Sequence, residues 1–461
     1  MLRRFIGDKA FYKMALSVAL PIMIQNAITN FVSLLDNIMV GQVGTLQMSG
    51  VSIVNQLMFV FNLCIFGAIS GAGIFTAQFA GSKDDEGVRH TFRFKILICL
   101  GLTVLGVGLF LAFGDQFVSL YLQGDATPED AAATLEYARG YLQVMLFGLL
   151  PFAISSAYAG TLRETGQTVV PMAAGITAVL VNLVLNALLI FGVEGFIAPM
   201  GVQGAAVATV LARDVERAIN VVWLHTHSKT NPYIKGAYRS LYIPRGLLRR
   251  ICIKGLPLLV NEALWSFGMA VLNQCYSTRG LDVVAATNIS STIWNLFSVS
   301  FMALGSAVGI IVGQMLGAGR SAEEVRDTDR KLIAFAVLSC GIFGTLLWAV
   351  SRVFPQIYNT TEQVRQLATA LICVGAVLMP FNAFTNATYF TLRSGGQTMV
   401  TFLFDSCFVW AVCVPVAFCL SRFTGLSILP LYIICQGLEL IKCVLGAWML
   451  KKGAWIQNLA Q

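Results

Sequence analysis

Long stretches without a charged side chain are the feature of this sequence that most restricts its fold. No Asp, Glu, Lys or Arg occurs in residues 37–82, and none occurs in residues 283–319. One crossing of a bilayer needs about 20 apolar residues. Charged residues make up only 12% of the 461 residues, whereas a soluble domain has about 25%. The composition therefore excludes an ordinary soluble enzyme, a disordered chain and a secreted disulfide scaffold, and it predicts a polytopic membrane protein.

Polar clusters and turns divide the chain into twelve apolar segments, and we predict that each forms a transmembrane helix. The segments are continuous apolar runs and not the alternating segments of a membrane β-barrel, so the expected fold class is all-α. The predicted helices lie at 14–38, 50–79, 93–113, 137–158, 168–191, 200–224, 248–275, 284–316, 331–351, 366–391, 398–420 and 427–450.

The basic residues gather on one side of these helices. If the N-terminus is cytoplasmic, most of the 31 Lys and Arg residues, Lys95 among them, lie in cytoplasmic loops or at helix ends that face them. This is the positive-inside pattern, and Lys442 is the one clear base within a predicted helix. We therefore expect a multi-pass protein of the plasma membrane with both termini in the cytoplasm. The net charge of +8 is explained by this bias and by attraction to the lipid bilayer, and it requires no nucleic acid.

Cysteine and histidine show no pattern of a metal or disulfide site. The 11 cysteines are odd in number, lie scattered through the predicted helices and form no CxxC pair, and the 3 histidines lack ligand spacing. We therefore expect no metal and no cofactor other than a coupling ion, H⁺ or Na⁺. A nucleotide-binding GxxxxGK[ST] loop is also missing from the sequence, which disfavours transport driven by ATP.

An internal repeat organises the chain into two halves. It predicts six-helix bundles of the same orientation at 1–224 and 248–461, joined by a basic cytoplasmic linker at 225–247. An even number of crossings in each half makes the repeats parallel, and two such bundles suit alternating access in a secondary transporter. The matching segments are Pro21–Ala27 with Pro257–Ala263, Gln78–Gly81 with Gln314–Gly317, and Leu162–Thr168 with Leu392–Thr398.

Three acids inside apolar segments are the candidates for cation coupling or substrate binding: Asp36, Glu262 and Asp405. A charged group at membrane depth costs several kcal/mol unless it has a partner, a water-filled cavity or a proton. Two of the acids also have a specific structural interpretation, which is a solvated helix end for Asp36 and interhelical hydrogen bonding for Glu262. For Asp405 a structural and a functional role are equally open. Glu439 lies three residues before Lys442, so we expect those two side chains to form a local helical pair.

The repeat also marks residues that could serve movement of the helices. Pro21 and Pro257 occupy equivalent positions in predicted helices 1 and 7, where proline kinks a helix, and we predict that they are hinges. The repeated motifs further supply polar candidates for the site, namely Gln25, Asn37, Gln78 and Gln314.

These motifs resemble the multidrug and toxic compound extrusion (MATE) family. The residues that carry the resemblance are Pro21–Gln25, Leu35–Gly41, Gln78–Gly81, Leu162–Gln167 and Trp455–Asn458, together with the second copies of the repeats. The resemblance covers essentially all of the chain. It implies an antiporter that exports small cationic amphipathic substrates in exchange for protons or sodium, and we expect it to function as a monomer.

The resemblance also assigns roles to individual residues. Asp36 matches the family's helix-1 acid, whose protonation accompanies a rearrangement of that helix at its proline, here Pro21. Glu262 resembles the helix-7 acid that serves cation coupling in one branch. This sequence departs from that branch because residues 366–391 contain no carboxylate, although Asp405 could substitute from the next helix. We therefore favour proton coupling over sodium coupling.

Two other classes of function are open to a chain of this composition. A flippase for a lipid-linked oligosaccharide or polysaccharide could share a two-bundle fold, but its pyrophosphate cargo calls for several bases inside the helices, and the predicted helix interiors have almost none. A membrane-embedded enzyme or a receptor would need a catalytic constellation or a sizeable extramembrane domain, and neither is visible in the sequence.

Overall fold

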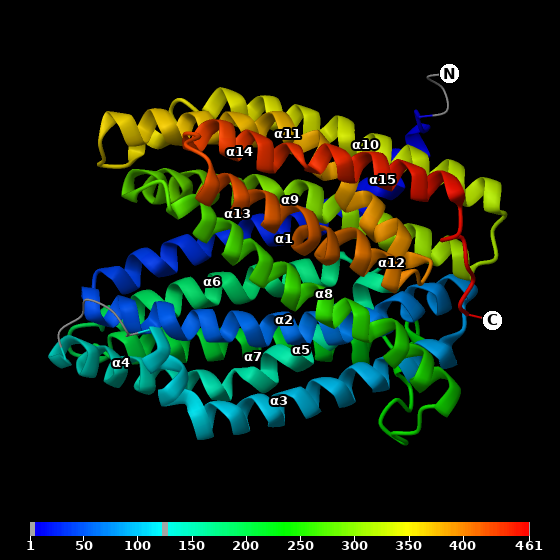
Figure 1. The fold of residues 1–461 in the computed structure, drawn as a ribbon. Coiled ribbons are helices and arrows are strands. Elements are labelled where there is room, and N and C mark those ends of the chain that lie inside the picture. The colour runs from blue at the N-terminus through cyan, green and yellow to red at the C-terminus, as the bar shows by residue number, and fades with distance from the viewer. Residues whose placement is uncertain (1–4, 122–127, 461) are drawn as a thin grey trace. The chain divides into compact units, whose positions relative to one another are not determined.

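The computed structural model describes residues 5–121 and 128–460, and within them it leaves out the side chains of Leu34, Asn37, Thr45, Tyr121 and Leu281. The described residues are almost entirely helical (Figure 1). Their only β-type pairing is an isolated bridge between Val193 and Ile197.

Every predicted transmembrane helix has a counterpart in the structure (Figure 1). The α-helices are α1 (Lys9–Gly41), α2 (Thr45–Ser82), α3 (Asp85–Tyr121), α4 (Pro128–Phe147), α5 (Leu149–Glu164), α6 (Val169–Phe191), α7 (Val202–Thr226), α8 (Arg245–Ser277), α9 (Leu281–Gly317), α10 (Ala322–Val350), α11 (Glu362–Ser394), α12 (Thr398–Phe402), α13 (Val414–Phe423), α14 (Ile428–Gly437) and α15 (Glu439–Lys452).

Within the described residues, 10 helices are long and apolar enough to cross a membrane, and there are 11 if α4 and α5, which meet at a bend of 45°, are counted as one span. The helix α7 corresponds to the predicted crossing at 200–224 but carries charged residues, from Arg213 to Arg217, in its second half. The predicted fold class, an all-α polytopic membrane protein, is confirmed.

Several predicted boundaries were wrong because helices continue beyond their apolar part. The segment predicted at 93–113 belongs to a helix that spans Asp85–Tyr121, and the one predicted at 331–351 belongs to a helix that begins at Ala322. Acidic residues occupy the first turn of both helices, where a negative charge interacts favourably with the helix dipole. Hydropathy locates only the apolar part of such a helix, so the prediction began too late in both cases.

The predicted helix at 398–420 is interrupted by two wide turns. Two π-helical segments, η4 (Leu403–Cys407) and η5 (Val409–Cys413), lie between α12 and α13. Pro415 lies two residues after the end of η5. Because proline has no N–H and its ring clashes with the carbonyl one turn before it, the preceding turn cannot close as a regular α-helix. The candidate residue Asp405 lies in η4, and π-helical turns of this kind are frequent at functional sites.

The chain forms two compact units. Unit 1 consists of Met1–Met23, Ala77–Asp84 and Cys252–Gln461, and unit 2 consists of Ile24–Thr76 and Asp85–Ile251. Three helices, α1, α2 and α8, therefore contribute residues to both units. The predicted bundles at 1–224 and 248–461 were divided by the sequence repeat, whereas the two units are divided by contacts within the structure. The two divisions answer different questions, so the predicted bundles stay a prediction.

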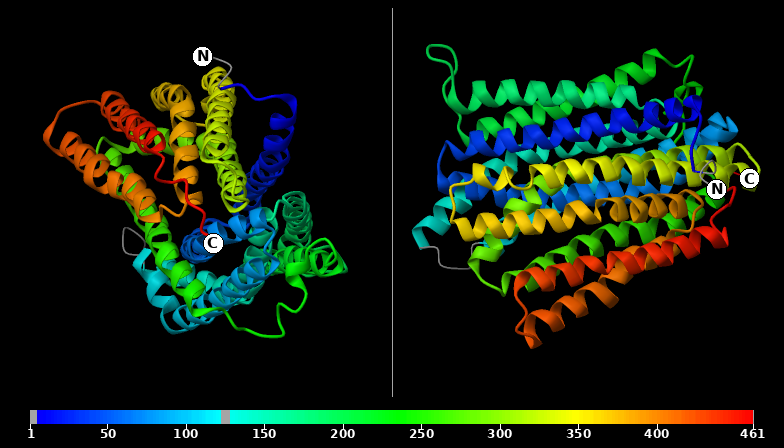
Figure 2. Two further views of the ribbon diagram at one scale, coloured as in Figure 1. Left: turned by 90° about the vertical axis from the view of Figure 1, so that its right-hand side faces the viewer. Right: turned by 90° about the horizontal axis from the view of Figure 1, so that it is seen from above.

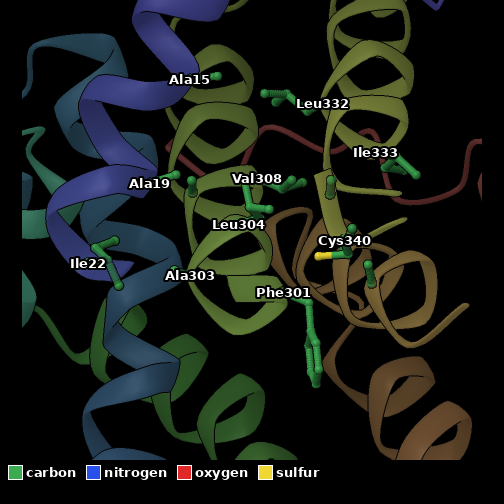
Figure 3. Close-up of a cluster of buried hydrophobic side chains, with 14 of the residues drawn as sticks. Ala15, Ala19, Ile22, Phe301, Ala303, Leu304, Val308, Leu332, Ile333 and Cys340 are labelled. Carbon is green, nitrogen blue, oxygen red and sulfur yellow. The ribbon is translucent and has the colours of Figure 1, made fainter. Parts of the chain in front are cut away.

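The core of unit 1 forms where the first part of α1 packs on the central helices α9, α10 and α11. Small side chains of α1, among them Ala15 and Ala19, lie against Leu304 and Val308 of α9, while Leu332 of α10 completes the contact (Figure 3). Alanine at these positions lets the helix backbones approach closely, as is usual between membrane helices. Figure 2 shows that the start of α1 and the end of α15 lie at the same end of unit 1.

The repeated Gln-x-x-Gly motifs meet each other inside unit 1. A Cβ atom at Gly81 would clash with the backbone carbonyl of Gln314, and a Cβ atom at Gly317 would clash with the carbonyl of Gln78. The ends of α2 and α9 thus cross in direct backbone contact, and each crossing helix supplies the glycine that admits the other. This explains why both glycines stand at the same place in the repeat.

The second repeated motif ends a helix in the same way in each unit. In unit 2 the N–H of Gln167 donates to the carbonyl of Leu162 at 2.7 Å, and in unit 1 the N–H of Gln397 donates to Leu392 at 3.1 Å. The residue before each glutamine is a glycine with a positive φ, 90° at Gly166 and 75° at Gly396. Both ends have the hydrogen-bond pattern of a Schellman cap, which favours glycine at this position.

The predicted basic linker is held against α3 within unit 2. The Arg93 guanidinium donates to the carbonyls of Ala237 at 2.7 Å and Gly236 at 3.0 Å, and Arg89 donates to the carbonyl of Tyr233 at 3.1 Å. Arginine has several donors in a fixed planar arrangement, which suits it to collect carbonyls from an irregular segment. These bases thus have a structural role in addition to their contribution to topology.

Because Gly317 lies against the Gln78 carbonyl, we expect Gly317→Ala to lower the free energy of unfolding by about 1–3 kcal/mol, the usual cost of overpacking. Gly108→Ala in α3 is the matched control, since its added methyl meets open space and alanine is about 1 kcal/mol better than glycine in a helix. Thermal unfolding of both purified variants in detergent measures the difference. Equal stability of the two variants would contradict the close crossing.

Candidate functional site

The carboxylate of Asp36 lies in a cluster of neutral polar side chains in unit 2. Asn186 of α6 donates its amide N–H to Asp36 Oδ1 at 2.8 Å. The amide of Asn182, one turn earlier on α6, lies 2.8 and 3.1 Å from the two carboxylate oxygens, with its nitrogen toward them in the orientation that satisfies both groups. In the same orientation, the amide oxygen of Asn182 lies 3.3 Å from the hydroxyl oxygen of Thr209 in α7.

No Lys or Arg in the described part of the chain forms an ion pair with Asp36. The side chain is half-buried, and Asn182 and Asn186 are buried. A carboxylate in such surroundings is stabilised only by hydrogen bonds that neutral groups donate, so loss or gain of a proton changes the net charge of the cluster. The side chain of the predicted neighbour Asn37 lies outside the described residues.

Gln25 links α1 to two other helices of unit 2. Its buried side chain accepts a hydrogen bond from Arg163 of α5 at 2.7 Å through Oε1, and it packs so close to Gly175 of α6 that a Cβ there would clash with it. Gln25 begins the next turn of α1 after Pro21, so the interaction fixes the helix directly after its proline.

Glu262 of α8 lies among polar groups of α11 in unit 1. The hydroxyl of Tyr389 donates to Glu262 Oε1 at 3.4 Å, and Arg393, one turn further along α11, is near enough to act on the carboxylate electrostatically. Pro257 lies slightly more than one turn before Glu262 on the same helix, and it is half-buried.

Asp405 forms an ion pair with Lys442, which the sequence analysis had paired with Glu439. Lys442 of α15 lies with its Nζ 2.7 Å from Asp405 Oδ1, and Asn261 of α8 donates to Asp405 Oδ2 at 3.1 Å. The expected local pair of Glu439 and Lys442 is therefore wrong. Glu439 instead accepts a hydrogen bond from Thr385 of α11. A lysine side chain is long enough to reach a neighbouring helix, and sequence spacing alone does not show which partner it takes.

The predicted polar residues Gln78 and Gln314 belong to the helix crossing in unit 1. Gln78 is fully buried and donates to the carbonyls of Ser394 at 2.9 Å and Gln457 at 3.1 Å, while its Oε1 accepts from the N–H of Leu459 at 2.5 Å. It thus fastens the segment after α15 to unit 1. The structure gives Gln78 contacts with backbone groups and not with any of the three candidate acids.

The sequence and the fold both match known proteins. A sequence model of the MatE family covers residues 21–188 and 257–419. The chain is 26% identical over 420 residues to the probable multidrug resistance protein YoeA of Bacillus subtilis, covering 90% of this chain and 88% of that protein. It is 24% identical to the probable multidrug resistance protein NorM of Thermotoga maritima, covering 91% and 88%.

A solved structure described as the outward-facing conformation of a multidrug resistance MATE family transporter of the MOP superfamily has the same fold. It superimposes with a TM-score of 0.85 at 20% identity, and the match covers 98% of both chains. The chain belongs to the MatE family. Members of this family are transporters, so the family confirms the resemblance drawn from the motifs and the predicted class of membrane transporter, and it excludes an enzyme.

One buried ion pair of this MatE protein was missed by the sequence analysis. Lys95 of α3 is completely buried in unit 2, where its ammonium group pairs with Glu164 at the end of α5 and also donates to Thr161 Oγ1 at 3.2 Å. Gly73 of α2 leaves the room that the Glu164 carboxylate occupies. The expectation that Lys442 is the one base within the helices was therefore wrong.

The reason for this error is the length of α3. The helix begins at Asp85, so Lys95 lies nearly three turns inside it and not at its N-terminal end, as the prediction assumed. A signal was present in the repeat, because Glu164 stands where the second copy has the neutral Ser394. When only one copy of a buried motif contains an acid, a base that pairs with this acid is expected in the same half of the chain.

We expect Lys95→Met to lower the free energy of unfolding by about 3–5 kcal/mol, because it leaves the Glu164 carboxylate buried without its partner. The double variant Lys95→Met with Glu164→Gln should recover much of that loss. Lys331→Met is the control, since Lys331 pairs with Asp327 on the surface of α10, where such a pair contributes at most about 1 kcal/mol. Thermal unfolding in detergent compares the three variants, and a double variant less stable than Lys95→Met contradicts the assignment.

Proposed function

We propose that this protein is a multidrug efflux antiporter of the plasma membrane, which exports small cationic amphipathic molecules in exchange for protons or sodium by alternating access. Two observations support the proposal: membership of the MatE family and the multidrug resistance function stated in the names of relatives that match about nine-tenths of the chain. We favour protons as the coupling ion. Both termini face the cytoplasm in this proposal, and the protein functions as a monomer.

The observation that carries the proposal is the neutral environment of the Asp36 carboxylate. An ionised Asp36 accepts N–H groups from Asn186 and Asn182. A protonated Asp36 must donate one hydrogen bond, and an asparagine accepts it after its amide turns over to present the oxygen. The two amides can therefore accommodate both protonation states, and none of the Lys and Arg side chains that the structure describes forms an ion pair with Asp36 to compensate the change of charge.

Movement of α1 is the proposed link between Asp36 and the substrate. Residues of α1 up to Met23 belong to unit 1 and those from Ile24 belong to unit 2, and Pro21 lies two residues before this division. Pro21 is the hinge in this proposal, because proline removes one backbone hydrogen bond from the helix. Gln25, bound to Arg163, keeps the following turn in place within unit 2. Pro257 has the equivalent role in α8.

Glu262 is the second coupling group in the proposal. Its described partner is a tyrosine hydroxyl, which can donate to a carboxylate or accept from a carboxylic acid. A cationic substrate that approaches Glu262 would compete with the proton for the same negative charge, as exchange of one for the other requires.

The two buried lysines do not favour a flippase for anionic lipid-linked sugars. Lys95 forms an ion pair with Glu164 and Lys442 forms one with Asp405, so both positive charges are already compensated within their units. A pyrophosphate group would have to displace a carboxylate from each of them.

We expect Asp36→Asn to abolish gradient-driven uptake of a fluorescent organic cation such as ethidium into inverted membrane vesicles, because asparagine cannot exchange a proton. An inside-acid proton gradient and an inside-high sodium gradient are imposed separately, and uptake should follow the proton gradient. Asp115→Asn is the control, since Asp115 is an exposed carboxylate that pairs with Arg139 at 2.7 Å.

Glu262→Gln is measured in the same vesicles, with the amount of each variant in the membrane determined alongside. If Asp36→Asn and Glu262→Gln both transport like the unaltered protein, the coupling mechanism is wrong. If uptake follows only the sodium gradient, the proposed antiport remains correct, but the coupling ion is sodium and not the proton.

A further inference from the structure

The ion pair of Lys442 with Asp405 places a positive charge deep within unit 1. The two side chains are 11% and 18% exposed, and their charged atoms lie 2.7 Å apart. The Lys442 ammonium also lies 5.2 Å from the centre of the Phe404 ring, close enough for a cation–π interaction. One carboxylate and one aromatic face therefore surround the ammonium group in the way that proteins bind free cations.

The other side of the Asp405 carboxylate is held by a rigid contact. Asn261 of α8 donates to Asp405 Oδ2, and its own Oδ1 accepts from the N–H of Ser406 at 3.2 Å and from the Ser406 hydroxyl at 2.7 Å. These residues of η4 lie in the widened π-helical turn. The contact occupies the Oδ2 side of the carboxylate and leaves Oδ1 for Lys442.

Acidic groups outnumber bases around this position. Glu439 lies one turn before Lys442 on α15, Glu262 lies next to Asn261 on α8, and both act electrostatically on the pair or on Asp405. Arg393 of α11 is the base that acts on Glu262. Cys413 of η5 and Cys443 of α15 are further titratable neighbours of Lys442. Without the lysine, unit 1 would contain a negatively charged oxygen site that attracts a small cation from solution.

We propose that the Lys442 ammonium is a tethered cation that fills a monovalent-cation position at Asp405, so that unit 1 needs no sodium ion at this place. Ammonium groups and sodium ions bind the same ligands, carboxylate and neutral oxygens, and differ mainly in their geometry. The local alternative for Lys442 was Glu439 on its own helix, yet the side chain crosses to Asp405. The proposal extends the proposed antiport, because it states which carboxylate is removed from ion exchange.

The test uses purified full-length protein in detergent, and it measures thermal unfolding in sodium, potassium or N-methylglucamine chloride at equal pH and ionic strength. The wild-type protein should unfold at the same temperature in all three salts. Lys442→Met should unfold several degrees lower in N-methylglucamine, which is too large for the position, and sodium should restore stability in a saturable manner.

Two control variants separate a cation site from a general effect of salt. Lys331→Met removes a surface lysine and should show no difference between sodium and N-methylglucamine. In the double variant Lys442→Met with Asp405→Asn, the sodium response should disappear, because the carboxylate that binds the ion has been removed. A sodium response that persists in the double variant overturns the proposal, as does a Lys442→Met protein that is equally stable in all three salts.

If Lys442→Met yields no folded protein, the wild-type protein decides the question. A saturable stabilisation of the wild type by sodium that Asp405→Asn abolishes would show that the position accepts an ion from solution, and the proposal would fail. Identical unfolding of the wild type in all salts supports it. These measurements need neither a gradient nor a drug, so their outcome is independent of whether Asp36 couples transport.

Discussion

The cost of placing a charge in a membrane interior governs the polar contacts of this protein. Removing a lysine or carboxylate side chain from water costs several kcal/mol of desolvation free energy. An opposite charge on a neighbouring helix is the most direct way to offset this cost. Lys95 and Glu164 do this in unit 2, and Lys442 and Asp405 do it in unit 1. Asp36 is different, because its described partners are the amides of Asn182 and Asn186 and not a base. Its charge can therefore change when it binds or releases a proton.

The two copies of the repeat share their backbone contacts but not their charges. The Gln-x-x-Gly segments and the helix-ending Leu-Arg-x-x-Gly-Gln segments have the same geometry in both copies. By contrast, Leu272 stands at the position equivalent to Asp36, and Asn26 stands at the position equivalent to Glu262. The repeat thus preserves what holds helices together, while the acids that could exchange ions occur once each. The two halves of the chain are suited to different chemistry.

Features with a local cause could be predicted from the sequence, and features that depend on a distant partner could not. Each apolar run that hydropathy marked as a crossing corresponds to helical structure among the described residues, because an apolar run of sufficient length needs no tertiary information. The partners of Lys442 and Lys95 were missed, since each reaches a residue on another helix and the nearest residue in sequence, as with Glu439, is a poor guide. The amides around Asp36 were missed for the same reason, because Asn182 and Asn186 are ordinary polar residues in an apolar helix until α1 is placed beside them.

The partners of the buried acids determine how easily each carboxylate can exchange a proton or an ion. A carboxylate that is paired with lysine at 2.7 Å exchanges a proton or an ion only after the ion pair opens, so Asp405 is poorly suited to rapid coupling. A carboxylate held by neutral donors needs only a rotation of an amide, which is open to Asp36. Glu262 accepts a hydrogen bond from Tyr389 and also lies within electrostatic reach of Arg393, so it stands between these two cases. An antiporter must change its charge only at its coupling groups and keep its remaining charges fixed, since every additional exchangeable site would let ions pass without substrate. In the proposed antiport, the ion pairs with lysine therefore restrict exchange to the carboxylates that have no lysine partner, Asp36 and Glu262.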